Sequence, residues 1–323
     1  MPKILHTARY TGAPWDVLRS CVPVGFEIET LDELSYDQLL RQVRDADYLL
    51  VSGRLPIDER VLAAAKGLKM IQRTGVGTDM LDLEAIGRRG IPVYVNPGVN
   101  ARSVAEHALT LMLCCLKNIP QISARTKAGA WQKQEAGLSC GMLCGKTVGL
   151  VGMGAIARQV SVLLKAFGAK VLYTDIRRLS PEDESRLGVA PADSFETLLS
   201  QSDIVSFHCP LTSANRRMLD AGRIALMKAG ASVVNTARGK LIDEEALFDA
   251  LSSGALRAAA LDVHDEEPLR PDSRLAKLEN VILTPHIAGL SHEAFRDMMA
   301  KAIANIAAFE RKEFDRLPER MPC

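Results

Sequence analysis

Three polar residues in the second half of the sequence could together move a proton and hold a carboxylate. Arg238 ends the run "SVVNTAR", Glu267 lies in "LDVHDEEP", and His286 ends "VILTPH". Histidine is the natural base near neutral pH, and a carboxylate against its second ring nitrogen would orient the ring. Arginine can grip a carboxylate through two parallel hydrogen bonds. Removal of a hydride from an alcohol carbon beside a carboxylate would need such a set.

The segments around these residues favour a shared site over three separate structural roles. Taken singly, His286 could be a core histidine in "ILTPHIAGL", Arg238 a surface ion-pair residue, and Glu267 a solvated loop carboxylate. Each residue, however, follows a strand-like apolar run. Because α/β folds bind ligands at the carboxyl ends of parallel strands, we expect the three side chains at one edge of a sheet.

A glycine-rich turn lies upstream of these residues. The stretch "TVGLVGMGAIARQVSVLLKAFGAKVLYTD" reads as a strand, Gly152-x-Gly154-x-x-Ala157, a helix, a second strand and Asp175. Gly152 permits the tight turn, and Gly154 lets the backbone approach a pyrophosphate at the helix N-terminus, where free N–H groups favour an anion. The motif stands between a strand and a helix, so it predicts a dinucleotide site.

The acidic residue after the second strand indicates which dinucleotide binds. The carboxylate of Asp175 can accept hydrogen bonds from ribose hydroxyls and would repel a 2′-phosphate, so NAD is favoured over NADP. Arg177 and Arg178 follow closely and could soften that preference. The upstream stretch "SCGMLCGKT" ends like a P-loop, but Cys140 replaces its first glycine and the segment leads into a strand. We discard it as a phosphate loop.

The predicted elements that position these residues form two α/β series. Strand-like runs "KILHT", "FEIE", "YLLVSG", "KMIQRTG" and "IPVYVNP" alternate with helical patterns near 36–45, 58–66 and 82–89. A long helix follows in "NARSVAEHALTLMLCCLKNI", where Ser103 and Glu106 have the spacing of a capping box. A second series begins at "KTVGLVGMG", and "SHEAFRDMMAKAIANIAAFERKEF" predicts a final amphipathic helix. Such alternation is typical of parallel sheets covered by helices on both faces.

Composition narrows the class of protein further. The 323 residues suffice for about two domains, and 40 Lys and Arg against 39 Asp and Glu suggest no nucleic-acid partner. Seven scattered cysteines without a CxxC pair, and six histidines without HExxH, predict neither disulfides nor a metal site. We expect no signal peptide, no transmembrane helix and a cytoplasmic location.

The residues quoted above, taken together, resemble the D-isomer-specific 2-hydroxyacid dehydrogenases. The matching segments are "RTGVGTDMLDLEA", "NPGVNARSVAEH", "GKTVGLVGMGAIA", "HCPLT", "NTARGKLIDEEAL", "ALDVHDEEP" and "LTPHIAG", in the family's order. The resemblance implies a Rossmann NAD-binding domain over 101–287, inserted into a flavodoxin-like substrate domain formed by 1–100 and 288–323. It implies reversible hydride transfer between NAD and a D-2-hydroxy acid or its 2-keto acid, in a homodimer formed through the NAD-binding domain.

The resemblance also assigns roles to individual residues. Arg238 would bind the substrate carboxylate and carbonyl, His286 would exchange the proton, and Glu267 would pair with His286. Main-chain N–H groups around Ser52, Gly53, Val76 and Gly77 would hold the substrate carboxylate. Contacts with NAD are expected from the glycine-rich turn and from residues at the other strand ends, namely Gly152, Gly154, Ala155, Ile156, Asp175, His208, Cys209, Pro210, Thr236, Ala237, Asp262 and Gly289.

The sequence leaves three points open. Arg54 beside the substrate loop could serve a phosphate or a second carboxylate, or could be an ordinary exposed loop arginine. An NAD(H)-sensing corepressor-like binding protein of the same fold is the alternative to an enzyme, and fold analogy alone does not separate the two. The side group of the substrate is not predicted.

Overall fold

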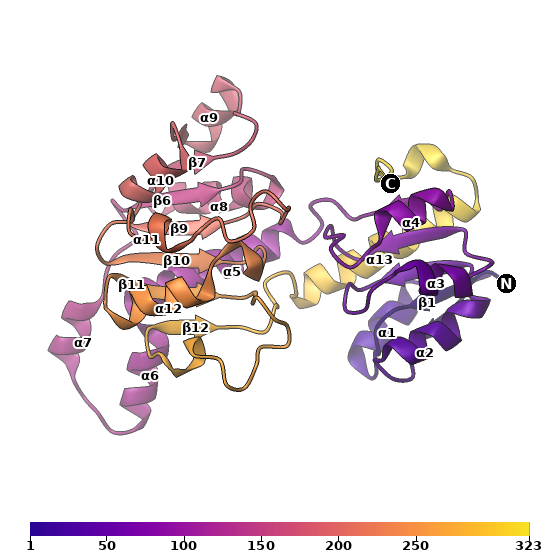
Figure 1. Cartoon of the computed structure of the whole chain (residues 1–323), viewed down its shortest axis with the longest axis horizontal. Coiled ribbons are helices and arrows are strands. Elements are labelled where there is room, and N and C mark those ends of the chain that lie inside the picture. The colour runs from indigo at the N-terminus through magenta and orange to yellow at the C-terminus, as the bar shows by residue number, and fades with distance from the viewer. Residues whose placement is uncertain (323) are drawn as a thin grey trace. The chain divides into compact units, whose positions relative to one another are not determined.

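The computed structural model describes residues 1–322, which form two compact units (Figure 1). One unit comprises residues 1–100 with the C-terminal segment from Ser291 onward, and the other comprises Ala101–Leu290. We call them the first and the second unit. The C-terminal segment therefore belongs to the same unit as the N-terminus, an arrangement that the period of the sequence pattern does not show.

The first unit is built on a five-stranded parallel sheet in the order β2-β1-β3-β4-β5. The order reverses between β1 and β3, as in flavodoxin-like folds. The strands are β1 (Lys3–His6), β2 (Glu27–Thr30), β3 (Tyr48–Val51), β4 (Met70–Arg73) and β5 (Val93–Tyr94), and the helices are α1 (Ala13–Ser20), α2 (Tyr36–Gln42), α3 (Glu59–Ala64), α4 (Leu83–Arg88) and α13 (His292–Glu310).

Apolar side chains cover both faces of this sheet. On one face, Leu39 and Val61 of α2 and α3 pack in a core cluster with Leu49 and Ile71. On the other face, the long helix α13 is buried along one side by residues spaced three or four apart, Met299, Ala302, Ile303 and Ile306. This amphipathic spacing explains why the last helix completes the first unit.

The second unit contains a seven-stranded parallel sheet in the order β12-β11-β10-β9-β6-β7-β8. Its strands are β6 (Thr147–Val151), β7 (Lys170–Thr174), β8 (Val189–Pro191), β9 (Ile204–Phe207), β10 (Ala231–Asn235), β11 (Leu256–Leu261) and β12 (Val281–Leu283). Its helices are α5 (Ala101–Lys117), α6 (Ile119–Lys127), α7 (Lys133–Ser139), α8 (Ala155–Ala166), α9 (Pro181–Leu187), α10 (Phe195–Gln201), α11 (Ala221–Ile224) and α12 (Glu244–Ser252).

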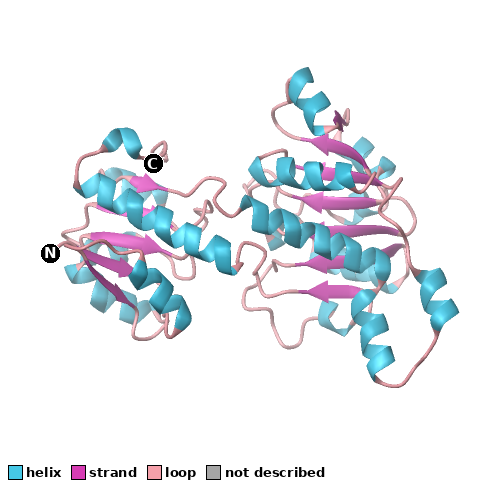
Figure 2. Cartoon of the chain, turned by 180° about the vertical axis from the view of Figure 1, so that it is seen from behind, coloured by secondary structure: helices cyan, strands magenta, loops and turns pink. Residues whose placement is uncertain are grey.

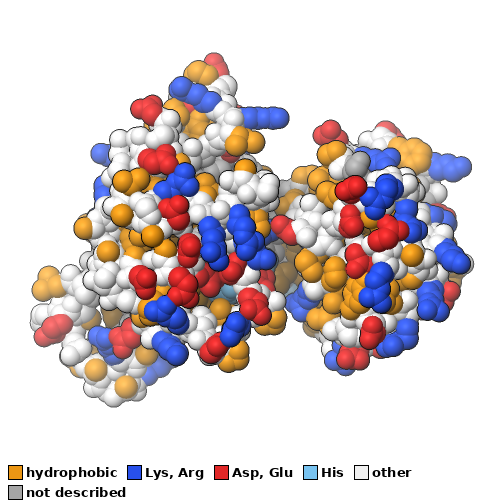
Figure 3. All heavy atoms as spheres, viewed as in Figure 1, with side chains coloured by type: hydrophobic (Ala, Val, Ile, Leu, Met, Phe, Trp, Pro, Cys, Tyr) orange, Lys and Arg blue, Asp and Glu red, His pale blue; other side chains and the backbone are white. Residues whose placement is uncertain are grey.

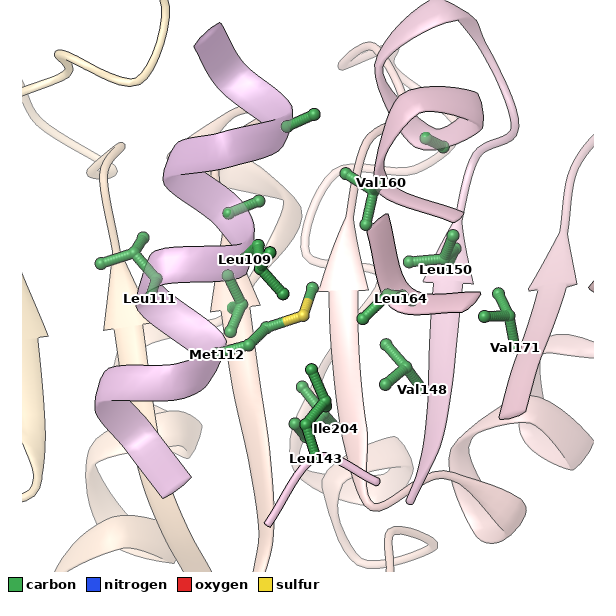
Figure 4. Packing of buried hydrophobic residues seen from close by; sticks show 14 of the residues in the cluster. Leu109, Leu111, Met112, Leu143, Val148, Leu150, Val160, Leu164, Val171 and Ile204 are labelled. Atoms are coloured by element: carbon green, nitrogen blue, oxygen red, sulfur yellow. The ribbon is translucent and has the colours of Figure 1, made fainter. Parts of the chain in front are cut away.

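Helices cover both faces of this sheet as well (Figure 2). Figure 4 shows one face, where Leu109 and Met112 of α5 and Val160 and Leu164 of α8 pack against strand residues such as Ile204. A second apolar cluster, with residues of α10, α11 and α12, covers the opposite face. Because the central strands are buried on both sides, they read as continuous apolar runs in the sequence. Two doubly wound parallel sheets confirm the predicted fold class.

One local prediction is wrong. Helix α5 begins at Ala101, two residues before the predicted cap, so Ser103 lies inside the first turn and forms no capping box with Glu106. The Ser103 hydroxyl instead donates a hydrogen bond of 2.8 Å to the carbonyl of Ala288, and Glu106 pairs with Arg102 at 2.6 Å. The Ser103 hydroxyl, which the spacing predicts to cap the helix, therefore forms a tertiary hydrogen bond instead.

The surface carries charges of both signs. On the face shown in Figure 3, Lys and Arg side chains are interspersed with Asp and Glu over each unit, in keeping with the formal net charge of +1. Within residues 1–322, no helix combines the length and apolar character that crossing a bilayer requires. The same residues contain no cluster of three or more His, Cys, Asp or Glu suited to a metal ion.

Candidate active site

The carboxyl edge of the second unit brings the three predicted catalytic residues to neighbouring strands. Arg238 follows β10, Glu267 follows β11 and His286 follows β12, and these strands are adjacent in the sheet. Parallel strands end on the same side, so the segments after them meet there. The sheet order, which the sequence pattern alone does not give, explains how residues so far apart in the chain converge.

His286 is exposed and held in an uncommon backbone conformation. Its side chain is 50% exposed, so the alternative of a core histidine does not hold. Its backbone φ is 56°, in the left-handed region that residues other than glycine rarely adopt. Its N–H donates a hydrogen bond of 2.8 Å to the carbonyl of Asp262, and Nδ1 lies 2.7 Å from Oε2 of Glu267.

Glu267 receives hydrogen bonds on both carboxylate oxygens. Its Oε1 accepts from the N–H of His264 at 3.1 Å, while Oε2 faces His286. Partial burial acts to raise the pKa of Glu267, but the hydrogen bond and charge of His286 outweigh it and hold that pKa below its usual value. An ionised carboxylate can only accept, so the proton shared by the pair belongs on Nδ1 of His286, which leaves Nε2 as the nitrogen that can exchange a proton.

Arg238 lies in a turn that is fixed by its neighbours. The buried side chain of Asn235 donates to the carbonyl of Arg238 at 2.9 Å and accepts from the N–H of Ala237 at 3.0 Å. A Cβ on Gly239 would lie 2.0 Å from the backbone of His264, so only glycine fits between these segments. This close approach packs the Arg238 turn directly against the segment that leads to Glu267. Asn235, Gly239 and His264 are positioning residues that sequence reasoning missed.

The glycine-rich turn joins β6 to α8 as predicted. Gly152 has φ of 92°, and a Cβ there would approach the backbone N of Cys209 to 2.8 Å, so the turn packs against the segment after β9. A Cβ at Gly154, in contrast, would meet nothing within 4 Å. The first glycine is therefore required by packing, and the second leaves open space beside the N-terminus of α8. Both features fit a bound pyrophosphate.

Asp175 is exposed at the end of β7 and is tied to this turn. Its Oδ2 accepts from the N–H of Met153 at 2.5 Å, and Oδ1 accepts from the N–H of Arg177 at 3.0 Å. The guanidinium of Arg178 is directed to Glu184, with a distance of 3.1 Å from Nε to Oε1. Of the two arginines that could soften the preference for NAD, Arg178 is thus engaged elsewhere.

Several other residues expected to contact NAD line the same edge. His208 is partly buried, its Nε2 lies 2.9 Å from the hydroxyl of Ser206, and desolvation of the ring lowers its pKa to about 4, so the ring is neutral at physiological pH. Its Nδ1 and the hydroxyl of Thr236 are buried without a hydrogen-bond partner among the described residues. Buried polar atoms usually have partners, so these two atoms fit a ligand at this edge.

The remaining expected contacts differ in their surroundings. Burial raises the pKa of the Cys209 thiol to about 11, so the thiol stays protonated beside Pro210. Ala155 and Ile156 open α8 as predicted, and Ala237 lies in the Arg238 turn. Asp262 is fully buried, and its side chain accepts hydrogen bonds from the N–H groups of Ile287 and Ala288, which precede Gly289. Its expected contact with NAD stays a prediction.

The residues expected to hold the substrate carboxylate lie in the first unit, at the ends of β3 and β4. The buried Arg73 joins their two loops, because Nη1 donates to the carbonyl of Val51 at 2.6 Å and Nε to that of Gly77 at 2.5 Å. Gly53 has φ of 83°, and a Cβ there would lie 2.8 Å from the Arg73 guanidinium. The N–H of Ser52 already donates to Thr7 at 3.2 Å. Within residues 1–322, the N–H groups of Gly53, Val76 and Gly77 have no acceptor.

Fold and site together define an α/β protein with a glycine-rich dinucleotide turn and a hydrogen-bonded histidine–glutamate pair. The model for the NAD-binding domain of D-isomer-specific 2-hydroxyacid dehydrogenases matches residues 109–288. A D-3-phosphoglycerate dehydrogenase of Archaeoglobus fulgidus is 40% identical over 287 residues, or 88% of this chain and 54% of that protein. A hydroxypyruvate reductase of Thermotoga maritima is 38% identical over 279 residues, or 86% of this chain and 89% of that protein.

A solved structure also matches this chain over nearly its whole length. The crystal structure of a protein from Thermus thermophilus superposes with a TM-score of 0.87 at 36% identity, covering 99% of this chain and 100% of the other. The chain belongs to the D-isomer-specific 2-hydroxyacid dehydrogenase family, and residues 109–288 match the family's NAD-binding domain. The chain spans about half the length of the archaeal phosphoglycerate dehydrogenase. These comparisons confirm the family and the cofactor NAD that the sequence predicts.

Proposed function

We propose that the protein is an NAD-dependent oxidoreductase that interconverts a D-2-hydroxy acid and its 2-keto acid. The observation that carries the proposal is the 2.7 Å contact between His286 and Glu267 at the sheet edge that also carries the glycine-rich turn. We further propose that the second unit binds NAD and that the first unit supplies the substrate carboxylate loops. No observation on the site favours the alternative of an NAD(H)-sensing binding protein.

The residues of the site divide the work of keto-acid reduction. Bound NADH supplies the hydride that reduces the keto carbon. Arg238 holds the carboxylate and polarises the carbonyl, and the N–H groups of Gly53, Val76 and Gly77 are available as donors to a carboxylate. Nε2 of His286 gives its proton to the carbonyl oxygen as that oxygen becomes a hydroxyl, and in the oxidation direction it takes the proton back.

Glu267 keeps the histidine ready for this exchange. Its carboxylate orients the ring through Nδ1 and stabilises the imidazolium that exists before the proton is given up. Its lowered pKa supports this role, because the carboxylate stays ionised to lower pH than an ordinary glutamate. The exposure of His286 supports access by a small substrate.

A keto-acid panel tests the proposal. Oxidation of NADH is followed with glyoxylate, hydroxypyruvate, pyruvate, 3-phosphohydroxypyruvate, 2-ketoglutarate and branched-chain keto acids, and the best substrate is repeated with NADPH. We expect turnover with at least one keto acid, preference for NADH, and a D-2-hydroxy acid as product. Tight NADH binding without turnover on every member of the panel would contradict the proposal and favour a nucleotide-sensing role.

We also propose that the protein acts as a homodimer through its NAD-binding domain. Helices α6 and α7 project from the sheet of the second unit (Figure 1), and large apolar side chains are exposed there, with Leu138 of α7 88% and Trp131 of the connecting loop 83% exposed. A cavity of about 810 Å³ lies between these helices and Arg257. Exposed apolar patches of this kind mark interfaces. A mass measurement by light scattering tests this, and a monomer at micromolar concentration would contradict it.

A further inference from the structure

The buried carboxylate of Asp262 has a role that hydride transfer to or from NAD does not require. Its Oδ1 accepts from the N–H of Ile287 at 2.9 Å and from the hydroxyl of Thr284 at 2.5 Å, and Oδ2 accepts from the N–H of Ala288 at 2.8 Å. Its carbonyl accepts from the N–H of His286 at 2.8 Å. One buried residue thus binds the chain on both sides of the proton-transfer histidine.

The conformation of His286 explains why such anchoring is needed. A histidine with φ of 56° is in a backbone region that persists only where the surroundings over-determine it. The side chain is half exposed and receives little packing of its own. The N–H groups of His286 and of the two residues after it all donate to Asp262, so these bonds hold the backbone that aims the ring.

Thr284 connects this carboxylate to a second histidine. Nε2 of His107, on α5, lies 3.2 Å from the Thr284 hydroxyl and 3.6 Å from Oδ1 of Asp262. The single hydrogen of the hydroxyl is used on the carboxylate, which can only accept. The hydroxyl oxygen therefore accepts from His107, whose Nε2 carries the hydrogen. Helix α5 is in this way bonded to the strand end before His286.

The same region also fixes the partner of His286. The ring Nε2 of His264 lies 3.0 Å from the carbonyl of Thr284, which can only accept a hydrogen bond. The N–H of His264 donates to Glu267. His264 therefore links the strand end that leads to His286 with the carboxylate that must face its ring. Both halves of the proton-transfer pair are positioned relative to Thr284.

We propose that Asp262, Thr284 and His107 form a clasp whose hydrogen bonds aim the ring of His286 at Glu267, which makes them positioning residues for proton transfer. The inference rests on the proposed function, since it assigns these residues to that reaction. The clasp uses both oxygens of Asp262 within the protein. It predicts that the hydroxyl of Thr284, which takes no part in the reaction itself, controls the rate of the chemical step.

The hydroxyl of Thr284 is the point at which the clasp can be opened with least disturbance. Thr284→Val keeps the side-chain shape and removes one donor and one acceptor, whereas Thr284→Ser keeps both. Small displacements of catalytic groups cost up to about 100-fold in rate, so we expect kcat for keto-acid reduction to fall about 10- to 100-fold in the valine variant. We expect the serine variant to stay within about threefold of wild type, because its hydroxyl bonds remain.

Further measurements separate positioning from general loss of structure. The dissociation constant for NADH and the thermal midpoint should change little in Thr284→Val, while kcat falls more than KM rises. Thr110→Val on α5 is the matched control, since its hydroxyl donates only to the carbonyl of Glu106, at 2.8 Å, and the residue is exposed. Wild-type kcat in Thr284→Val, or equal impairment in the serine variant, would overturn the clasp.

A spectroscopic readout keeps the clasp testable apart from the proposed function. The Nδ1 proton of His286, hydrogen-bonded to Glu267, should give a strongly downfield proton resonance that is absent in His286→Ala. We expect Thr284→Val to weaken or shift this resonance and Thr284→Ser to retain it. If wild type reduced no keto acid but the resonance responded in this way, the proposed function would fail and the clasp would stand. An unchanged resonance in Thr284→Val would refute the clasp.

Discussion

Replacing Glu267 with glutamine tests how the carboxylate supports His286. In the structure each oxygen of Glu267 receives one donor, Nδ1 of His286 on Oε2 and the N–H of His264 on Oε1. A glutamine side chain has one oxygen and one NH₂ group. The glutamine oxygen can accept from only one of the two donors, and the other donor then faces the glutamine NH₂ group, which cannot accept. Glu267→Gln therefore removes a charge and one hydrogen bond while the volume stays the same.

The magnitude follows from these two losses. Hydrogen bonds to charged groups contribute about 1.5–3 kcal/mol and neutral ones about 0.5–1.5 kcal/mol, so loss of the charge costs roughly 1–1.5 kcal/mol and the missing bond about 1 kcal/mol more. The side chains of His286 and Glu267 are 50% and 36% exposed, and water screening reduces the charge contribution. About 2 kcal/mol remains, which corresponds to a fall in kcat of about 30-fold.

The assay is keto-acid reduction with saturating NADH over about pH 6 to 9. The imidazolium loses its stabilising charge, so we expect the alkaline limb of the kcat profile to move to lower pH, in addition to a maximum that is about 30-fold lower. Glu266→Gln is the matched control, because this neighbouring glutamate is exposed. A Glu267→Gln enzyme with kcat within about threefold of wild type and an unmoved profile would refute the reasoning.

Three further outcomes follow from the described contacts. Gly239→Ala should lower the free energy of unfolding, measured in urea, by about 1–3 kcal/mol, because the added Cβ would lie 2.0 Å from the backbone of His264. Gly137→Ala is the control and should not lower it, because a Cβ there would meet no atom within 4 Å. Burial lowers the pKa of His6 to about 3, so between pH 6.5 and pH 5 the unfolded chain takes up a proton on this histidine that the folded chain does not. The free energy of unfolding should therefore fall by about 2 kcal/mol over this pH range, and the fall should be smaller in His6→Leu. Equal unfolding curves at both pH values would contradict this. Asp175→Ala should raise kcat/KM for NADPH relative to NADH by about tenfold, because the carboxylate no longer repels a 2′-phosphate, and an unchanged ratio would count against the assigned contact.

The sequence predicts the parts of the site that depend on local chemistry. A strand, two glycines, a helix start and Asp175 specify a dinucleotide turn within one short stretch, because each residue type has a backbone or charge requirement that few others meet. The same holds for Arg238 and His286, which stand at the ends of apolar runs. Parallel strands bring such ends together whatever the lengths of the connecting helices.

Interactions between distant segments are not predictable in this way. Asp262 reads as a residue near the cofactor, yet its oxygens bind the segment 284–288, and nothing in its neighbourhood along the chain indicates this. Ser103 has the spacing of a cap, but the helix already begins at Ala101 and the hydroxyl binds Ala288. The short, exposed helices α6 and α7 carry no buried stripe that would mark them in the sequence.

The most direct test of the central claim is a single-turnover measurement on His286→Ala. Enzyme with bound NADH is mixed with the best keto acid from the panel, and the rate of NADH oxidation is compared with wild type, alongside the NADH dissociation constant. A positioned general acid contributes about 10²- to 10⁴-fold, so we predict that the oxidation rate falls by this factor while NADH affinity stays within about twofold. Oxidation at a near wild-type rate from about pH 6 to about pH 9 would contradict the assignment of His286 as the proton-transfer group.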